Sequence, residues 1–170
     1  MTYLSRYETP LGFSDIILTS DGECLTGLRF ENASGTENAE ILSVKPELSI
    51  FAQTREWLDI YFSGKSPDFT PRYSLNGLTP FRKDVIDIIC TLEYGRTMTY
   101  GEIAKLLSEK RGLPRMSAQA VGGAVSRNPI CIIIPCHRVL GAGGRLIGYN
   151  GGLANKTALL AHEGIPYKAP

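Results

Sequence analysis

The sequence has no long hydrophobic run, since no apolar stretch in its 170 residues approaches the roughly 18 residues of a membrane span. Its start, MTYLSRYETP, has neither the basic residues and apolar block nor the small-residue cleavage site of a secretory signal. Both absences predict a soluble, cytoplasmic protein without a membrane partner. Cysteine is scarce too, and the four present are expected to be free thiols rather than a disulfide framework: Cys24, Cys90, Cys131 and Cys136.

Net charge is also small, at +1, but it is unevenly distributed along the chain. Residues 1–78 carry 6 Lys and Arg against 11 Asp and Glu, a net of −5, whereas residues 79–170 carry 12 against 6, a net of +6. A basic half is typical of a surface that binds a polyanion, and nucleic acid is the commonest such ligand. Chance asymmetry on a solvated surface explains the pattern equally well, so charge alone does not decide.

The first half of the chain is predicted to combine an antiparallel sheet with one helix. Segments rich in β-branched and aromatic residues, separated by the turn sequences TPLG and SDGE, predict strands at 2–8, 12–20 and 24–30. An amphipathic helix is predicted over 46–63, beginning near Pro46, with a core face of Phe51, Trp57, Leu58, Tyr61 and Phe62. The proline-containing stretch up to Pro80 is the natural linker, so we predict one domain over 1–78 and a second over 79–170.

The second half is predicted to be mainly helical. Thr79 and Pro80 are suited to the N-cap and the first position of a helix, and an apolar repeat follows them. Thr99 and Glu102 form a capping box for the next helix. The predicted buried stripe of that helix is Ile103, Leu106 and Leu107. Two short helices joined by a turn in a basic half predict a helix-turn-helix whose second helix meets DNA.

That second helix of the pair, capped by Ser117, has two contrasting faces. Its predicted core face is Ala120, Val121, Ala124 and Val125. The opposite face has one long side chain, Gln119, beside Gly122, Gly123 and Ser126. Interior glycines cost a helix about 1 kcal/mol each relative to alanine, so another backbone is expected to approach closely there. That backbone belongs either to a neighbouring helix or to DNA.

The octapeptide IIIPCHRV, residues 132–139, sets a nucleophile, a base and a cation side by side. Its isoleucines predict a buried strand that Pro135 ends. An ordinary cysteine thiol has a pKa of about 8.5 and is only a few per cent thiolate at neutral pH. A nucleophilic Cys136 therefore needs a neighbouring base or positive charge that favours its thiolate. His137 can supply the base, and Glu163 is the candidate carboxylate that orients its ring. An isolated Cys-His pair is more often structural than catalytic. Arg138 either anchors its loop on a carboxylate or contacts a phosphate, and the first is expected.

Four segments together resemble the O6-alkylguanine-DNA alkyltransferases, also called methylated-DNA–protein-cysteine methyltransferases. They are NPICIIIPCHRV (128–139), GYNGGLANKTALLAHEG (148–164), TYGEIAKLL (99–107) and SAQAVGGAV (117–125). The resemblance covers residues 79–164, whereas residues 1–78 share mainly the layout. It implies an α+β chain with an N-terminal ribonuclease H-like α/β domain, which carries an antiparallel sheet. The C-terminal domain is implied to be helical and winged-helix-like, entering the minor groove of DNA and flipping the damaged base.

The resemblance implies a repair reaction in which Cys136 accepts the alkyl group from O6 of guanine in one irreversible turnover. His137 is then the base of the thiol, acting through a bridging water with Glu163 behind it. Asn128 ties the recognition helix to the active-site segment. Tyr100 favours base flipping and donates a hydrogen bond to the departing guanine.

The base pocket implied by the resemblance is made largely of main chain. It comprises the carbonyls of Cys136 and Val139, with Tyr149 and the main chain at Asn150. Arg82 is a candidate phosphate contact, although a single arginine is more often solvated surface. The other candidate DNA contacts lie on the recognition helix and at its cap: Ser117, Ala118, Gln119, Gly122 and Gly123.

Several positions depart from the family pattern. Gln119 stands where an arginine commonly fills the gap left by the flipped base, which predicts weaker assistance to flipping. Asn150 replaces a common serine and leaves its main-chain N–H as the donor to O6. Cys131 lies where some members have proline, and it is expected to be a bystander thiol. The first half lacks the histidines of the zinc site that some members carry, so neither metal nor cofactor is expected.

The implied partner is double-stranded DNA containing O6-alkylguanine, bound by a monomer. The sequence leaves open whether O4-alkylthymine is accepted and whether binding along DNA is cooperative. Two other functions are weighed against repair. A sensor of alkylated bases is disfavoured by the intact Cys136, and a cysteine hydrolase using Cys136, His137 and Glu163 would turn over repeatedly.

Overall fold

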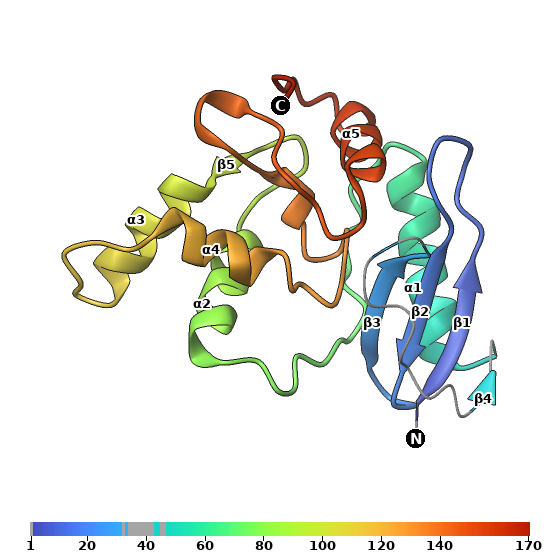
Figure 1. Cartoon of the computed structure of the whole chain (residues 1–170). Helices are drawn as coiled ribbons and strands as arrows, with labels where there is room; N and C mark the ends of the chain where they lie inside the picture. The colour runs from blue at the N-terminus through green and yellow to red at the C-terminus, as the bar shows by residue number, and fades with distance from the viewer. Residues whose placement is uncertain (1, 32, 34–42, 45–46) are drawn as a thin grey trace.

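The computed structural model describes residues 2–31, 33, 43–44 and 47–170, and its N-terminal part is built on a four-stranded sheet (Figure 1). Strands β1 (Tyr3–Tyr7), β2 (Ile16–Ser20) and β3 (Leu25–Phe30) pair antiparallel in the order β3-β2-β1. The predicted meander is therefore confirmed. A short strand, β4 (Ser43–Val44), pairs in parallel with β1, and it was not predicted because two residues are too few to show an alternating pattern.

Helix α1 (Ser49–Phe62) covers one face of this sheet (Figure 1). It begins later than the predicted residue 46, and Pro46 lies outside the described residues. Four of the five predicted core residues are buried, and Phe62 is partly buried against the same core. The apolar periodicity therefore predicted the packed face of this helix correctly.

The C-terminal half contributes α2 (Pro80–Ile89), α3 (Tyr100–Lys110) and α4 (Ala118–Val125), and these three helices pack on one another. Their predicted starts are confirmed. Each N-cap hydroxyl accepts a hydrogen bond from a backbone N–H in the first turn of its helix, and Thr99 and Glu102 complete the capping box. These caps satisfy N–H groups that have no partner within the helix.

Two residues of the predicted core faces are exposed. Leu106 is 42% exposed, because the buried face of α3 follows Ile103, Ala104 and Leu107 and so lies on the other side of the helix. Ala120 is also exposed, and Val121, Ala124 and Val125 alone form the buried face of α4. Both predictions are wrong because a short helix offers several apolar faces, and tertiary packing selects among them.

The isoleucine run is a buried turn, so the predicted strand is wrong. Ile134 N–H donates to Ile130 O at 3.1 Å and Cys136 N–H donates to Ile134 O at 2.8 Å, which coils the segment tightly. Ile132 has a φ of +68°, a left-handed value that is strained for a β-branched residue. An apolar run shows no period that separates a buried strand from a buried turn.

The segments after this turn complete the fold. Cys136–Arg138 form a single 3₁₀ turn, η1, which is followed by β6 (Val139–Leu140), η2 (Ala142–Gly144) and α5 (Leu153–His162). Strand β6 pairs in parallel with β5 (Met98–Thr99). In Figure 1, α5 is the last helix and lies close to the C-terminus.

One hydrophobic core runs through both halves of the chain. Buried residues from the sheet, α1, α2, α3, α4 and the 130–136 turn belong to the same cluster. Leu28 of β3 is hydrogen-bonded on both sides to the segment before Cys136, donating to Pro129 O at 2.9 Å and accepting from Cys131 N–H at 2.8 Å. The sheet therefore supports the turn that carries Cys136. Within the described part of the chain, no helix has the length and apolar character needed to cross a membrane.

Candidate active site

Cys136 lines an open cavity of about 780 Å³ between α3, α4 and the segment from Gly141 to Asn150. Only 2% of the residue is exposed, so its sulfur belongs to the floor of the cavity. Many of the residues predicted for the site meet on the walls: Tyr100, Ala118, Gln119, Gly122, Gly123, Tyr149 and Asn150. Segments far apart in the sequence thus converge on one thiol. Ser117 borders an adjoining groove, whereas Arg82 lines neither hollow.

Asn128 holds the sulfur from the core side. Its buried amide Nδ2 lies 3.0 Å from Cys136 Sγ and 2.9 Å from Ile134 O, with Ile130 O at 3.3 Å, so the two amide hydrogens are shared among three acceptors. Its Oδ1 accepts from Ile130 N–H at 2.9 Å. One side chain therefore fixes the turn and donates to the sulfur, a contact that favours the thiolate.

The surroundings of Cys136 lower its pKa despite burial. The neighbouring Cys131 thiol is the largest cause of this lowering, and the Asn128 amide, the Tyr149 hydroxyl and the positive charge of Lys156 add to it. Burial acts in the opposite direction. Of the two neighbouring thiols, Cys136 is the one that ionises, because it alone has the Asn128 amide against its sulfur.

Behind Cys136, the carboxylate of Glu163 is buried within a set of five donors. Oε1 accepts from Tyr61 Oη–H at 2.8 Å, His137 Nε2 at 2.7 Å and Arg138 Nη2 at 3.0 Å. Oε2 accepts from Arg138 Nε at 2.8 Å and from Gly95 N–H at 3.0 Å. Burial alone raises the pKa of Glu163, but the His137, Arg138 and Gly95 contacts outweigh it and hold that pKa well below its usual range.

This carboxylate fixes the state of the His137 ring. Because Oε1 of Glu163 accepts from Nε2, the proton of the neutral ring resides on Nε2 and Nδ1 keeps its lone pair. Burial is the main cause that lowers the pKa of His137, so the ring is neutral at neutral pH. Nδ1 is buried and has no hydrogen-bond partner among the described residues. A neutral imidazole with an available lone pair is the form required of a general base.

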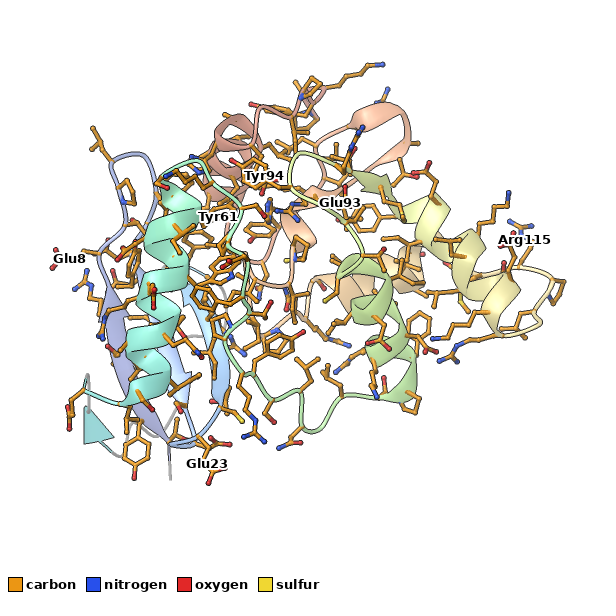
Figure 2. All side chains as sticks on the ribbon, turned by 180° about the vertical axis from the view of Figure 1, so that it is seen from behind. Glu8, Glu23, Tyr61, Glu93, Tyr94 and Arg115 are labelled. Carbon is orange, nitrogen blue, oxygen red and sulfur yellow. The ribbon has the colours of Figure 1, made fainter. Side chains whose placement is uncertain are left out.

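Arg138 has the anchoring role predicted for it. Besides its two bonds to Glu163, its Nη1 donates to Leu92 O at 2.6 Å, and its guanidinium lies over the ring of Tyr94 with its carbon 5.8 Å from the ring centroid. Figure 2 shows Tyr94 beside Tyr61 of α1, with their ring centroids 6.0 Å apart. The contribution of Tyr61 was missed, because its place in the α1 pattern predicts only a core residue.

Lys156 of α5 was also missed. It is fully buried, and its Nζ donates to Val139 O at 2.8 Å and Ile147 O at 2.9 Å, which joins β6 to the segment that lines the cavity. Burial lowers the pKa of Lys156 to about 8. A signal existed in the sequence, because Lys156 shares a helix face with Leu159 and Leu160, where a charged residue needs a buried partner.

Tyr100 and Gly122 are fitted to one another at the cavity wall. A Cβ atom at Gly122 would lie 3.8 Å from the Tyr100 ring, and nothing lies within 4 Å of the corresponding position at Gly123. Among the described residues, the predicted close approach of another backbone is therefore not found, and the Gly123 side is open. Burial raises the pKa of Tyr100 to about 12, so its hydroxyl remains a hydrogen-bond donor.

No set of three or more His, Cys, Asp or Glu side chains among the described residues is placed to hold a metal ion.

A second groove adjoins the cavity between α3 and the start of α4. Among its lining residues are Lys105, Arg115, Ser117 and Gln119. Basic and neutral polar groups thus extend outward from the cavity between α3 and the start of α4.

Each half of the chain matches a domain of a known protein family. Residues 2–72 match the 6-O-methylguanine DNA methyltransferase, ribonuclease-like domain. Residues 80–165 match the 6-O-methylguanine DNA methyltransferase, DNA binding domain. The α+β class, with a ribonuclease-like sheet half and a helical DNA-binding half, is thereby confirmed.

Individual relatives align over nearly the whole chain. The methylated-DNA–protein-cysteine methyltransferase of Mycobacterium leprae is 42% identical over 163 residues, 96% of this chain and 93% of the relative. That of Methanosarcina acetivorans is 40% identical over 164 residues, 95% of this chain and 98% of the relative. The crystal structure of Mycobacterium tuberculosis OGT in complex with DNA superposes with a TM-score of 0.80 at 36% identity, over 95% of this chain and 93% of that one. The chain belongs to the 6-O-methylguanine DNA methyltransferase family, that of the methylated-DNA–protein-cysteine methyltransferases.

Proposed function

We propose that this chain repairs DNA by transferring the alkyl group of O6-alkylguanine in duplex DNA to Cys136, once per molecule. The observation that carries the proposal is a thiol with a lowered pKa on the floor of an open cavity, beside a neutral His137 held by Glu163. The names of the relatives and the DNA in the Mycobacterium tuberculosis crystal structure support the same chemistry.

The reaction is a displacement at the alkyl carbon. His137 accepts the Cys136 proton at Nδ1 through a bridging water, and Glu163 stabilises the resulting imidazolium. The thiolate then attacks the carbon, the C–S bond forms, and the carbon–O6 bond breaks with its electron pair passing to the guanine. Tyr100 lines this cavity, and its protonated hydroxyl donates a hydrogen bond to the departing base, which offsets the developing negative charge.

The target base has to leave the helical stack to reach Cys136. Unstacking costs a few kcal/mol, and contacts with the rest of the DNA offset this cost. The start of α4 suits that approach, since Ser117, Ala118, Gln119 and Gly123 are exposed and carry little bulk except at Gln119. Lys105 and Arg115 in the adjoining groove are suited to phosphates.

Mass spectrometry tests the proposal. After incubation with excess duplex containing O6-methylguanine, the intact protein should gain one methyl group, located on the peptide that contains Cys136. The product is a thioether, so addition of more duplex should give no further turnover. Absence of the adduct contradicts repair and favours a sensor, and repeated turnover favours a hydrolase.

Replacement of Gln119 by arginine should accelerate repair of duplex. Gln119 lines the cavity mouth at the start of α4, and an arginine there adds a charge near phosphates and a longer side chain to fill the gap left by the base. We expect the single-turnover rate on duplex to rise about threefold to tenfold, from one added charge-assisted contact. The rate on a single strand, where no stack is opened, should change little. Equal rates of wild type and Gln119→Arg on duplex contradict the assigned role.

A further inference from the structure

Tyr61 of α1 connects the N-terminal half of the chain to the carboxylate behind His137. Its buried hydroxyl donates to Oε1 of Glu163 at 2.8 Å, across 102 positions of sequence. The ring of His162, next to Glu163, donates from Nε2 to the main-chain carbonyl of Tyr61 at 2.8 Å. The end of α5 is therefore held at Tyr61 twice, once through a side chain and once through the main chain.

The phenol ring of Tyr61 is enclosed by other aromatic rings, which fix the direction of its hydroxyl. Trp57, one turn earlier in α1, is stacked on it with ring centroids 5.5 Å apart and an angle of 8° between the planes. The rings of Phe62 and Tyr94 meet it edge to face at 5.3 Å and 6.0 Å, and Tyr94 lies beside it in Figure 2. Burial raises the pKa of Tyr61, so the hydroxyl keeps its hydrogen and acts as a donor.

Tyr61 and His137 bind the same oxygen atom. Oε1 of Glu163 accepts from three donors: His137 Nε2 at 2.7 Å, Tyr61 Oη at 2.8 Å and Arg138 Nη2 at 3.0 Å. A carboxylate oxygen offers about two lone-pair sites, so these donors share its electron density and each bond is weaker than it would be alone. Among the described residues, Oε2 accepts from two donors, Arg138 Nε and Gly95 N–H. The Tyr61 hydroxyl therefore competes directly with the His137 ring.

We propose that Tyr61 is a positioning residue of the active site, whose hydroxyl sets how strongly Glu163 binds the His137 ring. This inference deepens the proposed function and rests on it. Tyr61 acts through Glu163 and does not line the cavity that receives the alkyl group, so the proton transfer from Cys136 to His137 takes place as described above. The N-terminal half thereby contributes one group to the chemistry of the C-terminal half.

Removal of this hydroxyl should strengthen the bond between Glu163 and His137. With one competing donor gone, more of the negative charge at Oε1 faces Nε2, which favours the imidazolium over the neutral ring. A base that already holds a proton at neutral pH cannot accept one from Cys136. The other titratable or charged groups that face His137 or Glu163 come from η1, from α5 and from the segment before Gly95, and all remain when Tyr61 is replaced: Arg138, Lys156 and Tyr94.

Tyr61→Phe isolates the hydroxyl, because it keeps the ring and its aromatic neighbours. Tyr7→Phe is the matched control, since Tyr7 Oη donates to Oδ1 of Asp59 at 2.7 Å, a bond between tyrosine and carboxylate that lies within the N-terminal half and outside the cavity. Thermal unfolding of both variants measures the stability that each lost bond provided. The chain contains two histidines, so NMR resolves the His137 ring with His162 as an internal reference.

In Tyr61→Phe the resonance of the proton on Nε2 of His137 should move downfield, because its bond to Oε1 shortens when one donor is lost. The midpoint of the His137 titration should rise by about half a pH unit to one unit, since part of one hydrogen bond to a charged group passes to the ring. The single-turnover rate on a duplex containing O6-methylguanine should fall about threefold to tenfold on the acidic side of its pH profile and keep its alkaline plateau. Tyr7→Phe should match wild type in all three measurements.

An Nε2 proton resonance and a titration midpoint that stay as in wild type overturn the inference. So does the same change in Tyr7→Phe, which indicates a general loss of packing, and so does a rate that falls equally at every pH. The NMR measurements use no DNA, so they are independent of the proposed function. If Tyr61→Phe shifts the His137 signals but wild type takes no methyl group from DNA, then the role of Tyr61 is correct and the assigned substrate is wrong.

Discussion

A Cys136→Ser variant should leave the methyl group on a duplex containing O6-methylguanine, with a single-turnover rate reduced by more than about a thousandfold. The groups around the sulfur, Asn128 Nδ2 at 3.0 Å and the Lys156 charge, favour a thiolate. A serine hydroxyl is a far weaker acid, so the same surroundings cannot generate an alkoxide from it. The change removes no large contact in the core, and DNA binding should be retained in a gel-shift assay.

Cys131 makes the control for this experiment informative. It stays in the Cys136→Ser variant, but it is completely buried and does not line the cavity, so it should not take the methyl group. Mass spectrometry of the Cys131 peptide checks this directly. Cys24→Ser serves as the matched substitution, because it alters a thiol outside the active-site cavity and should transfer methyl at the wild-type rate. Methyl on Cys131, or unimpaired repair by Cys136→Ser, contradicts the assignment of the nucleophile.

The parts of the fold that depend on local chemistry could be predicted from the sequence. Strands β1 to β3 follow from segments rich in β-branched and aromatic residues with turn sequences between them, and the helix starts follow from Thr79, Thr99 and Ser117. Each of these signals lies within a few residues of the structure it specifies. Glu163 was predicted from its residue type as the carboxylate that orients His137, and the family resemblance supported this role. No local pattern joins residues 26 positions apart.

The remaining features depend on tertiary contacts that have no local signal. The apolar run at 132–134 is compatible with a buried strand or a buried turn. Hydrogen bonds from the Asn128 amide and to the backbone of β3 stabilise the turn. Leu106 is apolar, but the face of α3 that packs against the core carries Ile103, Ala104 and Leu107 and leaves Leu106 exposed. Lys156 finds two carbonyl groups from separate segments, and only the folded chain brings these together.

Replacement of Glu163 by glutamine should weaken both the reaction and the fold. The carboxylate accepts from five donors, and an amide replaces one of its oxygens by an NH₂ group that cannot accept. Breaking a buried ion pair by removing one partner costs about 3 to 5 kcal/mol. His137 also loses the group that fixes its tautomer and stabilises its charged form. We expect the single-turnover rate at neutral pH to fall by about a hundredfold or more.

The pH dependence of stability tests whether the charge of Glu163 is what stabilises the fold. The pKa of Glu163 in the folded chain is lowered, so its stabilisation is present above the unfolded value of about 4.3 and is lost as pH falls toward the folded value. The pKa of His137 is lowered as well, so stability also declines as pH falls below about 6.5. Glu163→Gln should therefore keep the decline below about 6.5 and lessen the decline below about 4.3, part of which remains because other carboxyl groups also have lowered pKa values.

Urea unfolding at a series of pH values measures these two declines separately. Glu93→Gln is the matched control, because Glu93 is an exposed carboxylate near Tyr94, on the segment that leads from α2 toward Gly95 (Figure 2). It should leave both the repair rate and the pH profile of stability as in wild type. If Glu163→Gln loses stability equally at every pH, packing and not charge accounts for the loss. If it repairs DNA at the wild-type rate, His137 does not depend on Glu163 in the reaction.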